Sequence, residues 1–106
     1  MAGPLINVPA MVKRGDVFEI KTLVRHPMET GYRRGISGEV MPRDIIGRFS
    51  CTYNGEEIFR AELFPAIAAN PFISFFAVAT DSGELVFTWT DEAGKHQTAT
   101  ATITVT

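Results

Sequence analysis

Apolar and polar residues alternate along most of this chain with a period of two, which is typical of β-strands that bury one face. Residues 16–25 show the pattern clearly, because Phe18, Ile20, Thr22 and Val24 lie on one face, which is nearly all apolar or β-branched. Strands are predicted over residues 5–8, 16–25, 45–53, 56–63, 72–79, 84–90 and 96–105. No segment shows a convincing helical stripe, so the pattern indicates an all-β protein.

Turn-forming residues separate the predicted strands. Asn54 and Gly55 suit the positive φ angles of a type I′ turn, so 45–53 and 56–63 should form a tight hairpin. The turn residues 81–83 predict a second hairpin, between 72–79 and 84–90. A further reversal over 91–95 should lead into the last strand.

About seven short strands in a chain of 106 residues favour an immunoglobulin-like antiparallel β-sandwich. We expect a single domain, residues 1–106, because no Pro, Gly and Ser-rich stretch is long enough to be a linker. The single cysteine, Cys51, cannot form the inter-sheet disulfide of true immunoglobulin domains.

The segment 72–79 departs from the pattern because it is apolar on both faces. An antiparallel strand with one wet face should carry polar residues at alternate positions. We expect Ile73 and Phe75 to lie on the outer face, where exposure of each would forgo roughly 1.5–3 kcal/mol of burial energy. Either the loop 25–44 folds back over them or a second protein chain covers them, and the pattern favours neither.

The longest irregular segment, residues 25–44, is a natural place for function on a rigid sandwich. His26 and Met28 lie at its start, and His26 is predicted to lock the conformation of the loop rather than to bind a ligand. Arg33 and Arg34 suit an anionic ligand or an acidic partner surface, and a solvated basic loop explains them equally well.

Charge and hydropathy exclude several classes of function. Residues 1–50 carry eight basic and five acidic residues, and residues 51–106 carry two and seven. This basic balance is too weak for a nucleic-acid-binding protein. No stretch approaches the roughly 20 apolar residues that cross a bilayer, and the first ten residues lack a signal-like pattern. We therefore expect no membrane contact and no signal peptide of its own.

The candidate chemistry is sparse, and neither a catalytic site nor a cofactor or metal site is expected. Two histidines, one cysteine and several methionines are the residue types of a blue-copper site, but no histidine or methionine lies within ten residues of Cys51. Cys51 is in register with Phe49 and Tyr53, which predicts a buried, inert thiol. Neither His26 nor His96 has a recognisable catalytic motif around it.

Four segments in order give the chain a family resemblance. They are RHPMETGYRR at 25–34, YNG at 53–55, LFPAIAANPF at 63–72 and FTWTD at 87–91. Together they resemble the SoxZ family of the bacterial sulfur-oxidising (Sox) system over almost the whole chain.

The resemblance implies an immunoglobulin-like sandwich that pairs with SoxY as the periplasmic SoxYZ carrier of sulfur substrates. In that family the reactive cysteine belongs to the Gly-rich C-terminal arm of SoxY, and export depends on a twin-arginine signal carried by SoxY. It further implies a non-enzymatic heterodimer with transient contacts to SoxAX, SoxB and SoxCD.

With the resemblance, a protein interface is favoured around Ile73 and Phe75, with His26, Met28, Arg33 and Arg34 as further candidates. Two alternatives stay open, an electron-transfer copper protein and a free-standing ligand-binding sandwich.

Overall fold

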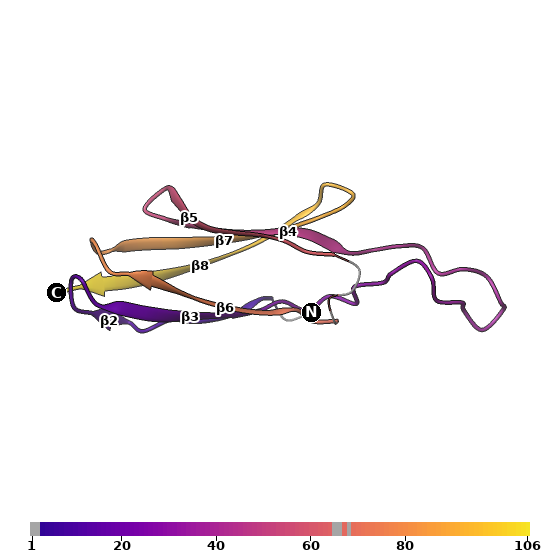
Figure 1. Cartoon of the computed structure of the whole chain (residues 1–106), viewed down its shortest axis with the longest axis horizontal. Helices are drawn as coiled ribbons and strands as arrows, with labels where there is room; N and C mark the ends of the chain where they lie inside the picture. The colour runs from indigo at the N-terminus through magenta and orange to yellow at the C-terminus, as the bar shows by residue number, and fades with distance from the viewer. Residues whose placement is uncertain (1–2, 65–66, 68) are drawn as a thin grey trace.

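The computed structural model describes residues 3–64, 67 and 69–106, and these form an all-β sandwich of two sheets (Figure 1). The strands are β1 (Leu5–Asn7), β2 (Met11–Val12), β3 (Val17–Leu23), β4 (Ile46–Tyr53), β5 (Glu56–Glu62), β6 (Phe72–Val78), β7 (Gly83–Asp91) and β8 (His96–Val105). The fold class is as predicted, an immunoglobulin-like sandwich. The described residues contain eight strands rather than seven, because the two-residue β2 pairs in parallel with β8.

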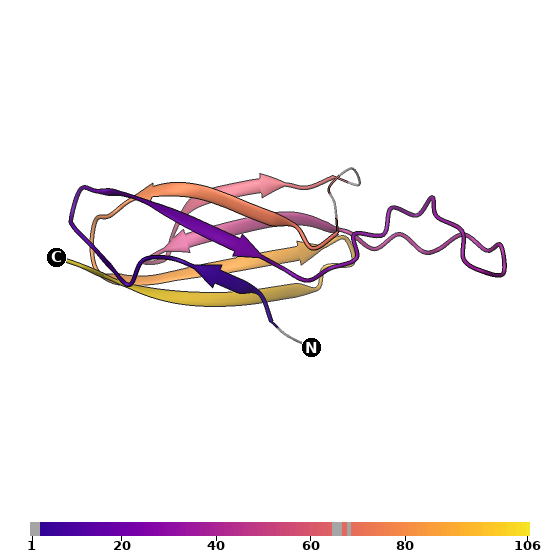
Figure 2. The ribbon, with the colours of Figure 1, turned by 90° about the horizontal axis from the view of Figure 1, so that it is seen from below.

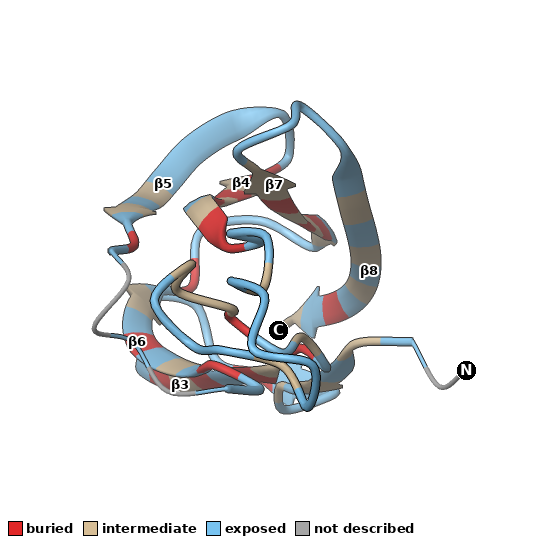
Figure 3. Cartoon of the chain, turned by 90° about the vertical axis from the view of Figure 1, so that its right-hand side faces the viewer, coloured by how far each residue is buried: buried red, intermediate tan, exposed pale blue. Residues whose placement is uncertain are grey.

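The strands divide into a three-stranded sheet, in the order β1-β3-β6, and a five-stranded sheet, in the order β2-β8-β7-β4-β5. Viewed along the long axis, the two sheets face each other, with β5 and β6 on the same side of the sandwich (Figure 3). This arrangement leaves each sheet with one inner face and one outer face.

Two of the predicted hairpins are confirmed and one is wrong. Asn54 and Gly55 have φ angles of 51° and 85°, as a type I′ turn requires, and join β4 to β5. Strands β7 and β8 also pair directly. The turn at 81–83 does not close a hairpin, because β6 pairs with β3 while β7 pairs with β4 and β8. The chain crosses there from one sheet to the other.

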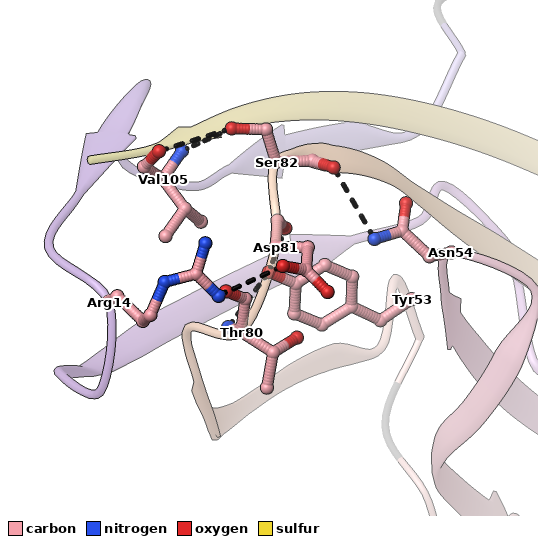
Figure 4. Close-up of polar contacts among 7 residues, drawn as sticks. All are labelled: Arg14, Tyr53, Asn54, Thr80, Asp81, Ser82 and Val105. Carbon is pink, nitrogen blue, oxygen red and sulfur yellow. Dashed lines mark hydrogen bonds and ion pairs between the residues drawn. The ribbon is translucent and has the colours of Figure 1, made fainter.

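Side-chain hydrogen bonds fix this crossover (Figure 4). The hydroxyl of Tyr53, at the end of β4, donates to the Asp81 carbonyl and accepts from the Thr80 amide. Arg14 pairs with the Asp81 carboxylate at 2.9 Å and also donates to the Thr80 carbonyl. The amide nitrogen of Asn54 donates to the Ser82 carbonyl. These contacts bind the turn to two other parts of the chain, at residues 53–54 and at Arg14, and hold it where the chain passes from one sheet to the other.

Aromatic side chains dominate the core between the sheets. Phe49 contacts Phe75, Phe87 and Trp89, with ring centroids 6.0, 6.4 and 5.2 Å away. Phe59 and Phe75 stack at 4.3 Å, which joins β5 of one sheet to β6 of the other. Such pairs add about 0.5–1.5 kcal/mol each beyond the burial of their area.

The loop between β3 and β4 projects as a two-limbed arm from one end of the sandwich (Figures 1 and 2). We call residues 25–44 the arm. Its limbs pair through the reciprocal backbone hydrogen bonds of Glu29 and Asp44, at 2.7 and 2.8 Å, and through a bridge between Arg34 and Val40. The arm does not fold back over either sheet, so the first explanation offered for the apolar strand 72–79 is wrong.

Candidate protein-binding site

The outer side of the three-stranded sheet is an apolar surface. Its exposed members are Val17 (64%), Phe72 (61%), Phe76 (67%), Val78 (51%) and Leu5 (52%). The register places Val17 opposite Val78, and Leu23 between Leu5 and Phe72, so these side chains lie together on one face. We call Leu5, Val17, Leu23, Phe72, Phe76 and Val78 the outer apolar face. A contiguous exposed surface of this kind is typical of a protein interface.

The prediction that Ile73 and Phe75 belong to this outer face is wrong. Phe75 is 7% exposed and lies against Phe49 and Phe59, and Ile73 is half-buried against the core. The alternate residues Phe72, Phe76 and Val78 face outward instead. The expectation of an apolar outer face therefore holds, with the two sides of the strand exchanged.

The error has a simple physical reason. A strand that is apolar on both sides satisfies the period of two in either orientation, so periodicity alone cannot decide which side is inner. The pairing with β3 decides, because Ile20 and Phe18 point into the core opposite Phe75 and Ala77. Phe75 then meets the rings of the other sheet.

His26 has the loop-locking role predicted for it at the base of the arm. Its Nδ1 accepts the Met28 amide at 2.9 Å, and its Nε2 lies 3.3 Å from a carboxylate oxygen of Asp44. Its backbone amide donates to the Asn70 side chain at 2.8 Å. With both ring nitrogens engaged, His26 joins both limbs of the arm to the connection between β5 and β6.

Met28 is part of the core and not of a partner surface, so its predicted place at an interface is wrong. It is buried, and its Sδ accepts the Ile46 amide at 3.3 Å. Its φ angle of 49° is left-handed, an uncommon conformation for a residue other than glycine. The apolar side chain thus anchors the root of the arm.

Arg33 and Arg34 lie on the exposed part of the arm. Arg33 pairs with Glu29 at 2.6 Å, and the guanidinium holds the pKa of Glu29 below its usual range through a hydrogen bond. Arg34 donates to the Gly38 carbonyl at 2.8 Å. Both guanidinium groups therefore support the arm while staying accessible, and their place at an interface stays a prediction.

Sequence reasoning missed the apolar side chains of the arm. Tyr32, Ile36 and Val40 are exposed. The available signal was the presence of large apolar residues in a glycine-rich polar loop, because a loop that contacts only water is expected to carry mainly polar and turn-forming residues. Near the end of the arm, Arg43 forms a two-pronged ion pair with Glu92, which follows β7, and both N–O distances are 2.7 Å.

Cys51 is a buried core residue, as predicted. It is fully enclosed on β4, and burial raises the pKa of its thiol to about 12. Because the thiolate is the nucleophile, a thiol that is enclosed and held protonated is unreactive.

Both histidines line a cavity of about 190 Å³ at the end of the sandwich, together with Trp89, Asp91, Lys95 and Gln97. His96 Nδ1 lies 3.0 Å from the Thr90 hydroxyl, and His26 is engaged as described. Within the described residues, no three His, Cys, Asp or Glu side chains gather closely enough to hold a metal ion.

Comparison with known protein families decides the family of the chain. The family model described as "Sulphur oxidation protein SoxZ" matches residues 6–102. The chain belongs to the SoxZ family. The match spans both sheets and the arm, so the resemblance first found in four short segments extends over nearly all of the chain. No curated protein sequence matches it.

Solved structures share the fold at low sequence identity. A superoxide reductase (neelaredoxin) from Ignicoccus hospitalis aligns with a TM-score of 0.73 and 19% identity, over 98% of this chain and 80% of that one. The sulfur carrier protein SoxY from Chlorobium limicola f thiosulfatophilum aligns with a TM-score of 0.68 and 15% identity, over 100% and 81%. At such identities the likeness is one of fold alone. This chain thus shares its fold with a protein described as a sulfur carrier.

Proposed function

We propose that this chain is the non-catalytic subunit of a SoxYZ carrier, in which SoxY bears the sulfur intermediate of thiosulfate oxidation. Membership of the SoxZ family and the likeness in fold to a SoxY protein support a role in the Sox system. The buried, protonated Cys51 fits a subunit that does not itself bind the sulfur substrate. The complex would work in the periplasm, exported together with SoxY.

The outer apolar face is the observation that carries this proposal. In the isolated chain, the exposed Val17, Phe72 and Phe76 forgo part of the roughly 1.5–3 kcal/mol that burial of such a side chain contributes. A SoxY subunit docked on the three-stranded sheet would recover that energy. Glu19 and Lys21 lie among these side chains, with Lys21 Nζ 3.6 Å from Glu19 Oε1, and would sit in the docked surface as an ion pair.

Co-purification with SoxY tests the proposal. Phe76→Asp places a charge at the centre of the outer apolar face without touching the core, so the chain should fold and lose SoxY. Thr100→Asp is the matched control, because Thr100 is an exposed residue on the outer face of the five-stranded sheet. Circular dichroism and the fluorescence of the single tryptophan check the fold. Undiminished recovery of SoxY with Phe76→Asp contradicts the proposed docking face.

The arm supplies a second surface, which we assign to the transient contacts with SoxAX, SoxB or SoxCD. Its accessible arginines and its exposed apolar residues Tyr32 and Ile36 suit an acidic, partly apolar partner surface. Replacing Arg33 and Arg34 by Ala should slow docking of the carrier to a Sox enzyme at low ionic strength and matter less as salt is added. An unchanged rate at low salt contradicts this steering role.

A further inference from the structure

Strand β6 carries a second feature, an edge that is unpaired within the described residues. The two sheets have four edge strands, β1, β2, β5 and β6. Strands β1 and β2 are only 3 and 2 residues long, which limits pairing with another chain. Strand β6 is 7 residues long, and within the described part of the chain β3 is its only strand partner.

The β5 edge is protected and the β6 edge is not. Strand β5 carries Glu56, Glu57, Arg60 and Glu62, and its ladder with β4 is interrupted by a register shift. Charges and bulges are the usual devices that keep an edge from pairing. Strand β6 reads FISFFAV, without a charge or a proline, and its register with β3 is continuous. By the same criteria the edge of β6 is open to pairing with a strand of another chain.

The direction of its backbone groups follows from the hydrogen bonds at its two ends. Just before the strand, the Pro71 carbonyl accepts the Val24 amide, and just after it, the Ala79 amide donates to the Asp16 carbonyl. Backbone groups alternate in direction along a strand, so Ile73, Phe75 and Ala77 also pair with β3. The alternate residues Phe72, Ser74, Phe76 and Val78 direct their N–H and C=O groups to the open side.

We propose that the SoxY subunit of the proposed complex pairs one of its own edge strands with β6, so that one sheet continues across both proteins. This inference rests on the proposed function and specifies how the partner docks. SoxY suits this edge because a SoxY protein has the same sandwich fold, which has edge strands of its own. Moreover, the outer apolar face assigned to SoxY includes Phe72, Phe76 and Val78 of this same strand. One partner strand would satisfy the free backbone groups while its neighbours cover the aromatic rings.

Amide hydrogen exchange tests the pairing, because the exchange rates of successive β6 amides should alternate in the isolated chain and not in the complex. In the isolated chain the amides of Ser74, Phe76 and Val78 should exchange fast, while those of Phe75 and Ala77, bonded to β3, exchange slowly. In the complex with SoxY all five should be slow. Fast exchange of Ser74 and Phe76 in an intact complex overturns strand pairing and leaves docking on the outer face standing. Protection that depends on the concentration of this chain alone, without SoxY, overturns the choice of SoxY as occupant.

A proline provides the second test. Ser74→Pro removes an amide that points to the open side and keeps the ladder with β3, as edge strands tolerate. We expect SoxY affinity to fall about tenfold or more, from a lost hydrogen bond and the obstruction of the incoming strand. Ser74→Ala, which keeps the amide, should bind SoxY normally. Arg60→Pro on the free edge of β5, a residue whose amide points away from β4 by the same alternation, should also bind normally.

The two variants separate the two proposals. Loss of SoxY with Phe76→Asp but not with a folded Ser74→Pro supports the outer apolar face and overturns strand pairing. If SoxY fails to bind even the unmodified chain, the proposed function itself is wrong. The exchange measurement on the unmodified complex decides the matter if Ser74→Pro does not fold.

Discussion

The outer faces of the two sheets differ sharply although their inner faces are alike. The outer face of the five-stranded sheet is mainly polar, with threonines along β7 and β8 and Arg48, Ser50 and Thr52 on β4. The outer face of the three-stranded sheet carries Val17, Phe72, Phe76 and Val78. Both faces belong to one chain, so overall hydrophobicity does not explain the difference. The polar face suits water, and the apolar face suits a protein partner.

The largest expected effect concerns the two sides of β6. Phe75→Ala removes a ring from the core and should lower the free energy of unfolding by about 3–5 kcal/mol. Phe76→Ala, one residue further on the outer side, should change it by under about 0.5 kcal/mol in the isolated chain. Denaturant unfolding of both variants measures the difference. Equal losses would show that the outer ring is already covered by this chain and would remove the contrast between the faces.

A second effect concerns the sealed inner side of β4. Burial raises the pKa of Cys51 from its ordinary 9.0 to about 12, so the folded chain keeps a proton that the unfolded chain releases. The free energy of unfolding should therefore fall by about 1.4 kcal/mol per pH unit between these two values, and be unaffected by this thiol below pH 9. Denaturant unfolding over this range compares the chain with Cys51→Ala, which lacks this contribution. Identical pH dependence in the two proteins would mean that the inner face admits water.

The smallest expected effect comes from exchanging residue types between the two outer faces. Val17→Thr and Thr100→Val should each alter the free energy of unfolding of the isolated chain by under about 0.5 kcal/mol, because both sites are exposed. The affinity for SoxY should nevertheless decrease with Val17→Thr and stay unchanged with Thr100→Val. An unchanged SoxY affinity with Val17→Thr would indicate that Val17 lies outside the docking surface.

How far sequence reasoning reached depends on how unequal the two sides of each strand are. In β4 the side of Phe49, Cys51 and Tyr53 is apolar and the side of Arg48, Ser50 and Thr52 is polar, so the burial of Cys51 was predicted correctly. In β6 both sides are apolar, and the prediction exchanged them. The false hairpin at 81–83 has a related cause, because turn residues mark a reversal without stating which sheet the chain enters next.

The alternation, the Asn54–Gly55 turn and the lone cysteine determined by themselves that this is an all-β sandwich without an inter-sheet disulfide. These features are local, because the conformational preferences of the backbone depend on neighbouring residues. Tertiary structure alone decided that Phe75 is inside and Phe76 outside, that Met28 anchors an arm, and that β6 has a free edge. Such outcomes depend on contacts between residues far apart in the chain, where the better of two locally equal arrangements is selected by packing and pairing.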